Sequence, residues 1–235
     1  MKVLAIIPAY GEAATIGKVV EEVRRARPDL DMVVVDDCSP DGTGARARAA
    51  GAPVLPLPVN LGIGGAVQTG FKYAALRGYD ALVQVDGDGQ HDPAEIGQIL
   101  GPLAEGRADV VIGSRFLQKT KYRAPFARRM GMLLFSGMAR WAMGQRIADT
   151  TSGFRALNRR AFVYLARNYP VDFPDAESLV LLRRAGFRLL EVPVRMRPRI
   201  SGRTSTTTLK SIYYPFKQTL SILVVLLRQV PPREE

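Results

Sequence analysis

The sequence predicts a single α/β domain built on a mostly parallel sheet. Short apolar runs in the first half of the chain alternate with segments whose apolar residues recur at helical spacing. The apolar runs show no polar alternation, which is typical of strands buried on both faces of a parallel sheet. Polar clusters follow several of these runs, as expected where strands end at a ligand-binding edge.

The expected elements alternate between strand and helix. In the first half they are strand 3–7, helix 15–27, strand 32–35, helix 42–50, strand 53–55, helix 63–76, strand 81–85, helix 93–103 and strand 109–113. The second half is less regular, with helices expected at 125–143, 161–167 and 176–185, a strand at 188–194 and a helical segment at 207–227. Pro93 suits the first turn of its helix, because a proline there loses no helical hydrogen bond.

Composition sets the broad class of protein. A chain of 235 residues, 47% of them hydrophobic, can bury a sizeable core. The single cysteine, Cys38, excludes an internal disulfide and suits the cytoplasm. We expect no signal peptide at the start of the sequence, and no segment reaches the roughly 20 apolar residues of a membrane-spanning helix.

The net charge of +11 is unevenly distributed. Residues 110–148 and 192–233 contain many Arg and Lys but no Asp or Glu. Such blocks predict an anionic partner, such as a phosphorylated ligand or an anionic lipid. We expect no nucleic-acid partner, because the sequence has no helix-turn-helix, RNA-binding aromatic pair or zinc pattern.

The sharpest chemical feature is Asp86-Gly87-Asp88, directly after a predicted strand. Its spacing lets both carboxylates face one cation, and oxygen ligands suit Mg²⁺ or Mn²⁺. Such an ion would bridge a pyrophosphate and stabilise the charge on a departing nucleoside diphosphate. Taken alone, the motif fits an ordinary loop cap better than a metal site.

Further polar clusters follow other strands. Asp37 could accept hydrogen bonds from a base or ribose, or could help to cap the next helix. Residues 60–65, which include Gly64, open a helix whose start favours a phosphate or a hydroxyl-rich group. Their glycine spacing is not that of a dinucleotide site. His91, the only histidine, follows Gln90 and is either structural or a group that orients ligands near the metal.

The ordered set of motifs resembles glycosyltransferase family 2, and within it the branch of dolichol-phosphate mannose synthase and its bacterial polyprenyl-phosphate relatives. The matching segments are Pro8-Ala9-Tyr10-Gly11-Glu12, residues 35–43, Asn60-Leu61-Gly62, residues 86–91, Gly113-Ser114-Arg115 and residues 151–155. The resemblance runs from Pro8 to about Arg203. It departs at Gly11, where the family usually has Asn, and at the C-terminus, where many relatives continue into transmembrane helices.

The resemblance implies a GT-A-type fold over residues 1–205, an amphipathic C-terminal segment at 206–235, and inverting transfer from a GDP- or UDP-sugar. It also implies site residues. They are Pro8, Tyr10, Glu12 and Asp37 near the base and ribose; Gly64 at the helix start; Asp86, Asp88 and Gln90 at the metal; and Arg115, Arg199 and Arg203 at phosphates.

The acceptor decides whether a general base is needed. A phosphate is already ionised, whereas a sugar hydroxyl must lose a proton. Asp175 is the first candidate for a base, and Glu177 is the second, although Glu177 fits a charged helix start equally well. Both readings stay open at this stage.

The segment 210–228 combines apolar and basic residues, which suits a helix lying on anionic lipid, although a core helix or a protein contact fits it too. We therefore expect a peripheral enzyme at the cytoplasmic face of the cell membrane that glycosylates a polyprenyl phosphate. A small membrane-protein partner stays open. The alternatives are transfer to a hydroxyl of a polysaccharide or lipid-linked glycan, and a non-catalytic nucleotide-sugar-binding membrane adaptor.

Overall fold

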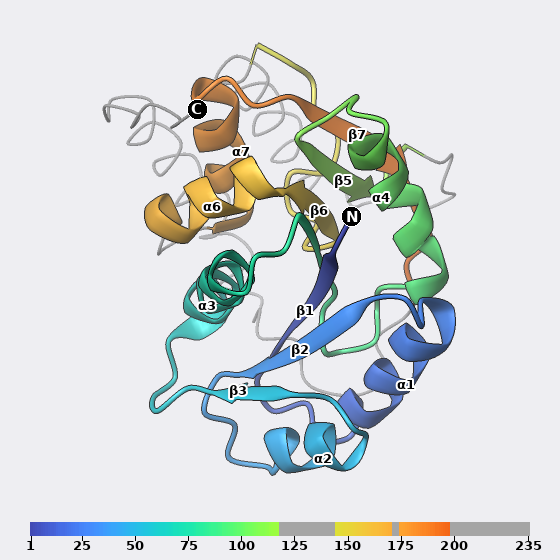
Figure 1. Cartoon of the computed structure of the whole chain (residues 1–235), viewed down its shortest axis with the longest axis vertical. Coiled ribbons are helices and arrows are strands. Elements are labelled where there is room, and N and C mark those ends of the chain that lie inside the picture. The colour runs from blue at the N-terminus through green and yellow to red at the C-terminus, as the bar shows by residue number, and fades with distance from the viewer. Residues whose placement is uncertain (118–143, 171–173, 198–235) are drawn as a thin grey trace, which may run out of the picture.

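The computed structural model describes residues 1–117, 144–170 and 174–197 (Figure 1). Its strands are β1 (Val3–Ala9), β2 (Asp31–Asp36), β3 (Val54–Pro56), β4 (Ala81–Gln84), β5 (Val110–Ser114), β6 (Arg155–Asn158) and β7 (Leu189–Pro193). Its helices are α1 (Ile16–Ala26), α2 (Thr43–Ala49), α3 (Gly62–Leu76), the 3-10 helix η1 (Pro93–Glu95), α4 (Ile96–Ala104), α6 (Arg159–Asn168) and α7 (Pro174–Arg184). The helices expected at 125–143 and 207–227 lie outside the described residues.

The strands form one sheet in the order β3-β2-β1-β4-β6-β5-β7. β6 runs antiparallel to both of its neighbours, and every other pairing is parallel. The mostly parallel α/β sheet predicted from the sequence is therefore confirmed. β6 itself was not expected, because Arg155-Ala156-Leu157-Asn158 offers only two apolar residues and no clear strand pattern.

Helices cover both faces of the sheet. In Figure 1, α3, α6 and α7 lie on one side, and α1 and α4 lie on the other. All seven residues of β1 are buried, and they contribute alternately to the two cores: Leu4 and Ile6 face the α3 side, and Ala5 and Ile7 face the α1 side. Burial on both faces is what a strand without polar alternation predicts.

In helix α1, the apolar residues that recur at helical spacing are the ones that pack against the sheet. Ile16, Val19, Val20 and Val23 recur at helical spacing, and all four are buried against the sheet.

Within the described residues, no helix is both long enough and apolar enough to cross a membrane.

The edge of the sheet where β5 begins is held by a buried carboxylate. Asp109 is 1% exposed, and its oxygens accept hydrogen bonds from the backbone N–H of Arg188 at 2.8 Å, from Asn158 at 2.8 Å and from Arg160 at 3.0 Å. Burial alone would raise the pKa of Asp109, but these hydrogen bonds from Arg188, Arg160 and Asn158 outweigh it and lower the pKa to about 2. The carboxylate thus ties the starts of β5 and β7 to the end of β6.

The lowered pKa predicts a pH-dependent contribution to stability. Asp109 stabilises the fold fully above about pH 4, and this contribution disappears as the pH falls towards 2. We expect Asp109→Asn to lower the free energy of unfolding by about 2 kcal/mol at pH 7 and by about half as much at pH 3. Urea unfolding at both pH values measures this. An equal loss at the two values would contradict the assignment.

Asp29→Asn is the matched control for this experiment. Asp29 pairs with Arg27 on the surface, where its side chain is 60% exposed. Exposed ion pairs contribute little to stability, so this variant should unfold close to wild type at pH 7.

Candidate active site

Four loops meet at the edge where β1, β2, β4 and β5 end, and β6 begins at the same edge, because Arg155 is paired with Gln84 of β4 and with Ile112 of β5. The loop after β4 carries Asp86 and Asp88. The carboxylate of Asp86 remains 35% exposed, whereas Asp88 is 6% exposed and accepts a hydrogen bond from the backbone N–H of Gln90 at 3.0 Å.

The loop after β4 is packed tightly against β1. A side chain at Gly87 would come within 3.2 Å of Ala9 and of the carbonyl oxygen of Pro8. The buried hydroxyl of Thr15 lies 2.9 Å from the Gly87 carbonyl and 2.8 Å from the Glu12 carboxylate. The loops after β1 and β4 are therefore joined to each other before any ligand is considered.

The loop after β2 holds the loop after β1. The backbone N–H groups of Gly11, Glu12 and Ala13 donate to the side chains of Ser39, Thr43 and Asp41, respectively. Tyr10 remains 54% exposed at this edge, and Pro8 lies within β1. Two motifs that are 28 to 31 residues apart in the sequence thus form one structural unit.

Gly11, the departure from the family pattern, has a backbone reason. Its φ is +69°, in the left-handed region, and a side chain there would meet no atom within 4 Å. Glycine adopts this conformation freely, and Asn is among the few other residues that adopt it at low cost. Gly11 therefore keeps the turn that an Asn would form.

Asp37 directly follows β2, and its side chain contacts the start of α3. It is 2% exposed, its Oδ1 accepts a hydrogen bond from the backbone N–H of Leu61 at 2.7 Å, and its carbonyl accepts one from Asn60. Gly62 begins the helix with a φ of +75°, and Gly64 is buried in the first turn. The Asp37 and Asn60-Leu61-Gly62 motifs are thus in direct contact, and one oxygen of Asp37 stabilises the helix start.

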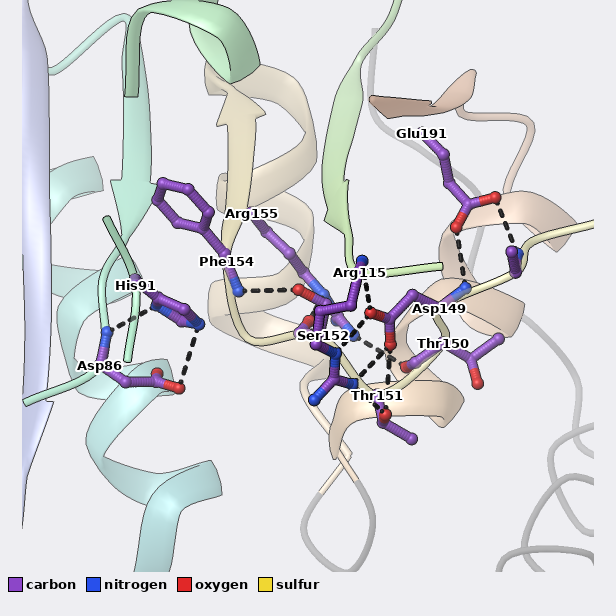
Figure 2. Close-up of polar contacts among 11 residues, drawn as sticks. Asp86, His91, Arg115, Asp149, Thr150, Thr151, Ser152, Phe154, Arg155 and Glu191 are labelled. Atoms are coloured by element: carbon purple, nitrogen blue, oxygen red, sulfur yellow. Dashed lines mark hydrogen bonds and ion pairs between the residues drawn. The ribbon is translucent and has the colours of Figure 1, made fainter. Parts of the chain in front are cut away.

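Arg115, which follows β5, forms a partly buried ion pair with Asp149 that the sequence did not predict. Its Nε and Nη2 bind the two carboxylate oxygens of Asp149 at 2.7 and 2.6 Å, and Nη2 also lies 2.8 Å from Thr151 (Figure 2). The backbone N–H groups of Ala148 and Asp149 donate to the carboxylate of Glu191 on β7 at 2.7 and 2.8 Å. Asp149 thereby fixes the orientation of the Arg115 guanidinium.

Arg155 is a second structural residue that sequence reasoning missed. It is 5% exposed, and its guanidinium donates to the carbonyls of Ser152 and Thr150 and to the hydroxyl of Ser178 on α7. This one side chain connects the segment before β6 with α7. The same helix carries Glu177, which is 8% exposed.

The structure brings most of the predicted site residues to one edge. They are Pro8, Tyr10, Glu12, Asp37, Gly64, Asp86, Asp88, Gln90 and Arg115. Asp175 belongs to the first turn of α7, but its side chain lies outside the described part of the structure. Arg199 and Arg203 lie outside the described residues as well.

The donor atoms at this edge fit a hard divalent cation. Within the described residues, no group of three or more His, Cys, Asp or Glu side chains is arranged to hold a metal alone. Asp86 and Asp88 offer oxygen ligands, and Mg²⁺ commonly binds one or two carboxylates together with substrate phosphates. The residues therefore suit an ion that takes its other ligands from a diphosphate and water.

Residues 4–165 match the family model described as glycosyl transferase family 2. The chain belongs to glycosyltransferase family 2. Similar proteins include the undecaprenyl-phosphate mannosyltransferase of Micrococcus luteus, which is 36% identical over 86% of each chain. The polyprenol monophosphomannose synthase of Mycolicibacterium smegmatis is 34% identical over 86% of this chain and 79% of its own.

The fold is that of solved glycosyltransferases. The glucosyl-3-phosphoglycerate synthase of Mycobacterium tuberculosis, in complex with Mn²⁺, UDP and phosphoglyceric acid, matches with a TM-score of 0.74 and 22% identity over 98% of this chain and 79% of that chain. This likeness, together with the family match, confirms the predicted GT-A-type fold.

The left-handed turn at Gly11 predicts which side chains this glycosyltransferase tolerates there. We expect Gly11→Ala to lower the free energy of unfolding by about 1 kcal/mol, and Gly11→Asn to cost less than half of that. Urea unfolding measures both values. Gly97→Ala in α4 is the control, because its site is open and its φ is not positive, so it should leave stability unchanged or raise it. Equal losses for Ala and Asn would contradict the backbone explanation.

Proposed function

We propose that this family 2 glycosyltransferase performs an inverting, metal-dependent transfer of a sugar from a GDP- or UDP-sugar to a polyprenyl phosphate. The assignment of a polyprenyl-phosphate acceptor rests on the similarity to proteins named as polyprenyl-phosphate mannosyltransferases. This similarity covers 86% of the chain, which is more than residues 4–165 of the family model. The gathering of carboxylates and an arginine at one edge of the sheet supports the chemistry.

The donor half of the site follows from the loops after β1, β2 and β3. We assign Pro8, Tyr10, Glu12 and Asp37 to the base and ribose, with Gly64 in the first turn of α3 near the hydroxyl-rich or phosphate part of the donor. The exposed ring of Tyr10 offers a surface for stacking a base. The cross-linking of these loops supports a preformed pocket, which lowers the entropic cost of binding.

Asp86, Asp88 and Gln90 are assigned to a Mg²⁺ or Mn²⁺ ion. When bound, such an ion stabilises the negative charge that develops on the departing nucleoside diphosphate. The chain's own contribution is to hold the carboxylates in place and to supply positive charge beside them. We assign Arg115 to a phosphate group in this role, with Arg199 and Arg203 as further phosphate ligands.

Inversion corresponds to a single displacement. An oxygen of the acceptor phosphate forms a bond to the anomeric carbon as the bond from that carbon to the diphosphate breaks. The phosphate acceptor is already ionised, so no proton has to be removed by Asp175 or Glu177. The burial of Glu177, next to the Arg155 contact on α7, supports a structural role for it.

A lipid acceptor places the reaction at a membrane surface. We propose that the enzyme works peripherally at the cytoplasmic face of the cell membrane, with the basic and apolar segment 206–235 contacting anionic lipid. A small membrane-protein partner is compatible with this arrangement.

The test is sugar transfer from a panel of GDP- and UDP-sugars to undecaprenyl phosphate in detergent, with Mn²⁺ or Mg²⁺. We expect sugar transfer to undecaprenyl phosphate to be retained within a fewfold in Asp175→Asn and to fall by at least about 100-fold in Asp88→Ala. The stereochemistry of the product, read by NMR of its anomeric proton, tests inversion. Asp29→Asn, which changes an exposed carboxylate paired with Arg27, serves as the matched control.

Other outcomes point elsewhere. Transfer only to a glycan hydroxyl, abolished in Asp175→Asn, would overturn the lipid-phosphate proposal in favour of a polysaccharide glycosyltransferase. Nucleotide-sugar binding with no transfer to either acceptor class would favour the non-catalytic adaptor.

A further inference from the structure

The carboxylate of Asp86 is flanked by two residues that the proposed function leaves without a role. The side chain of His91 lies on one side of it, and Gly153, from the segment before β6, lies against it as well. Figure 2 shows His91 and Asp86 facing each other, with Phe154 beside the imidazole. These residues come from two sequence motifs more than 60 residues apart.

His91 is held in one orientation. It is 2% exposed, and its ring stacks on Phe154 with centroids 4.7 Å apart and planes inclined by 20°. Its backbone forms an antiparallel bridge with Met196, and the backbone N–H of Arg197 donates to the carbonyl of Gln90 at 2.9 Å. The Arg197 guanidinium also binds Asp92 and Glu22 in ion pairs. The imidazole therefore has little freedom to turn.

The contacts of the His91 ring indicate which of its two nitrogens carries the hydrogen. The backbone N–H of Asp86 donates to Nδ1 of His91 at 3.0 Å, so Nδ1 acts as an acceptor. A neutral imidazole with a bare Nδ1 carries its hydrogen on Nε2. Nε2 lies 3.5 Å from Oδ2 of Asp86, so the N–H side of the ring faces the carboxylate. The imidazole of His91 thus contacts both the backbone N–H and the side-chain carboxylate of Asp86.

Gly153 limits the carboxylate sterically. A Cβ at this position would lie 3.0 Å from both carboxylate oxygens of Asp86 and 3.1 Å from the amide nitrogen of Gln84. That amide nitrogen lies 3.4 Å from Oδ1 of Asp86. Since the φ of Gly153 is not in the left-handed region, the backbone would accept an alanine. An added methyl group could therefore be accommodated only if the Asp86 carboxylate or the Gln84 amide shifted by a few tenths of an ångström.

We propose that His91 and Gly153 are positioning residues that hold the Asp86 carboxylate in the orientation needed to bind the divalent cation. This inference rests on the proposed metal-dependent function. His91 acts through its two contacts with Asp86, and Gly153 acts by leaving room for the carboxylate. Neither residue is assigned to the donor sugar or to the acceptor.

The experiment measures Mn²⁺ affinity directly, by electron paramagnetic resonance of free Mn²⁺ in the presence of UDP and, in parallel, of GDP. His91→Phe removes both ring nitrogens but keeps an aromatic ring against Phe154. Gly153→Ala adds one methyl group beside the carboxylate. We expect each change to weaken Mn²⁺ binding by about 10-fold or more, because groups that orient metal ligands typically contribute this much. Gly97→Ala, at an open position in α4, should leave Mn²⁺ affinity unchanged.

Nucleotide affinity in EDTA separates positioning from a general loss of structure. We expect it to stay within about twofold of wild type in both variants, since neither residue is assigned to the base or ribose. An equal loss of nucleotide affinity without metal would overturn the proposal, and so would Mn²⁺ affinity within twofold of wild type in both variants.

The wild-type protein supplies a further test that needs no variant. His91 is the only histidine, so the imidazole signals of a ¹⁵N-histidine-labelled sample belong to it alone. We expect the neutral tautomer with the proton on Nε2. A proton on Nδ1 would overturn the assigned contacts.

The outcomes also distinguish this inference from the proposed function. If wild type binds Mn²⁺ with a nucleotide but transfers no sugar to a polyprenyl phosphate, the acceptor proposal fails and the positioning role stands. If wild type binds no Mn²⁺ with either nucleotide, the metal-dependent proposal and this inference both fail.

Discussion

β6 runs antiparallel between β4 and β5, and the arrangement of the active-site edge depends on this pairing. Because its direction is reversed, β6 begins where its two neighbours end. The segment just before it therefore reaches both the Asp86 loop after β4 and Arg115 after β5. The buried Arg155 fastens this segment by binding the carbonyls of Thr150 and Ser152. A parallel strand in this place would carry its preceding loop to the opposite edge of the sheet.

The loops at this edge are held mainly by one another. Thr15 joins the loops after β1 and β4, the Asp37 carboxylate binds the backbone at the start of α3, and Glu191 binds the backbone at Asp149. Buried hydrogen bonds of this kind cost more to break than they contribute when formed, because a buried polar group left unpaired loses its solvation. The positions of the functional side chains are therefore largely set by the fold, and binding need not supply the ordering free energy.

Local pattern predicted much of this structure. Apolar runs gave β1, β2 and β4 to within a few residues, and Asp86-Gly87-Asp88 stood out because its residues are adjacent in the chain. β6 was missed because a short strand that begins with a buried arginine has no recognisable pattern. The pairing of Arg115 with Asp149 joins residues 34 apart, and no spacing rule relates them. Contacts of that kind depend on strand order, which the sequence does not reveal by itself.

Asp109 and Asp86 lie at opposite edges of the sheet, and their carboxylates differ in how strongly the protein binds them. Asp109 is 1% exposed, and close donors from the backbone and from Arg160, Arg188 and Asn158 saturate it. Asp86 is 35% exposed, and within the described part of the chain its carboxylate has only long contacts, at 3.4 Å to Gln84 and 3.5 Å to the ring of His91. A saturated carboxylate has no lone pairs to offer a ligand, whereas one that is oriented but loosely bonded keeps them available. The looser bonding of Asp86 therefore fits the proposed metal ligand, which would receive its strongest partner from solution, whereas the saturated Asp109 fits a purely structural role.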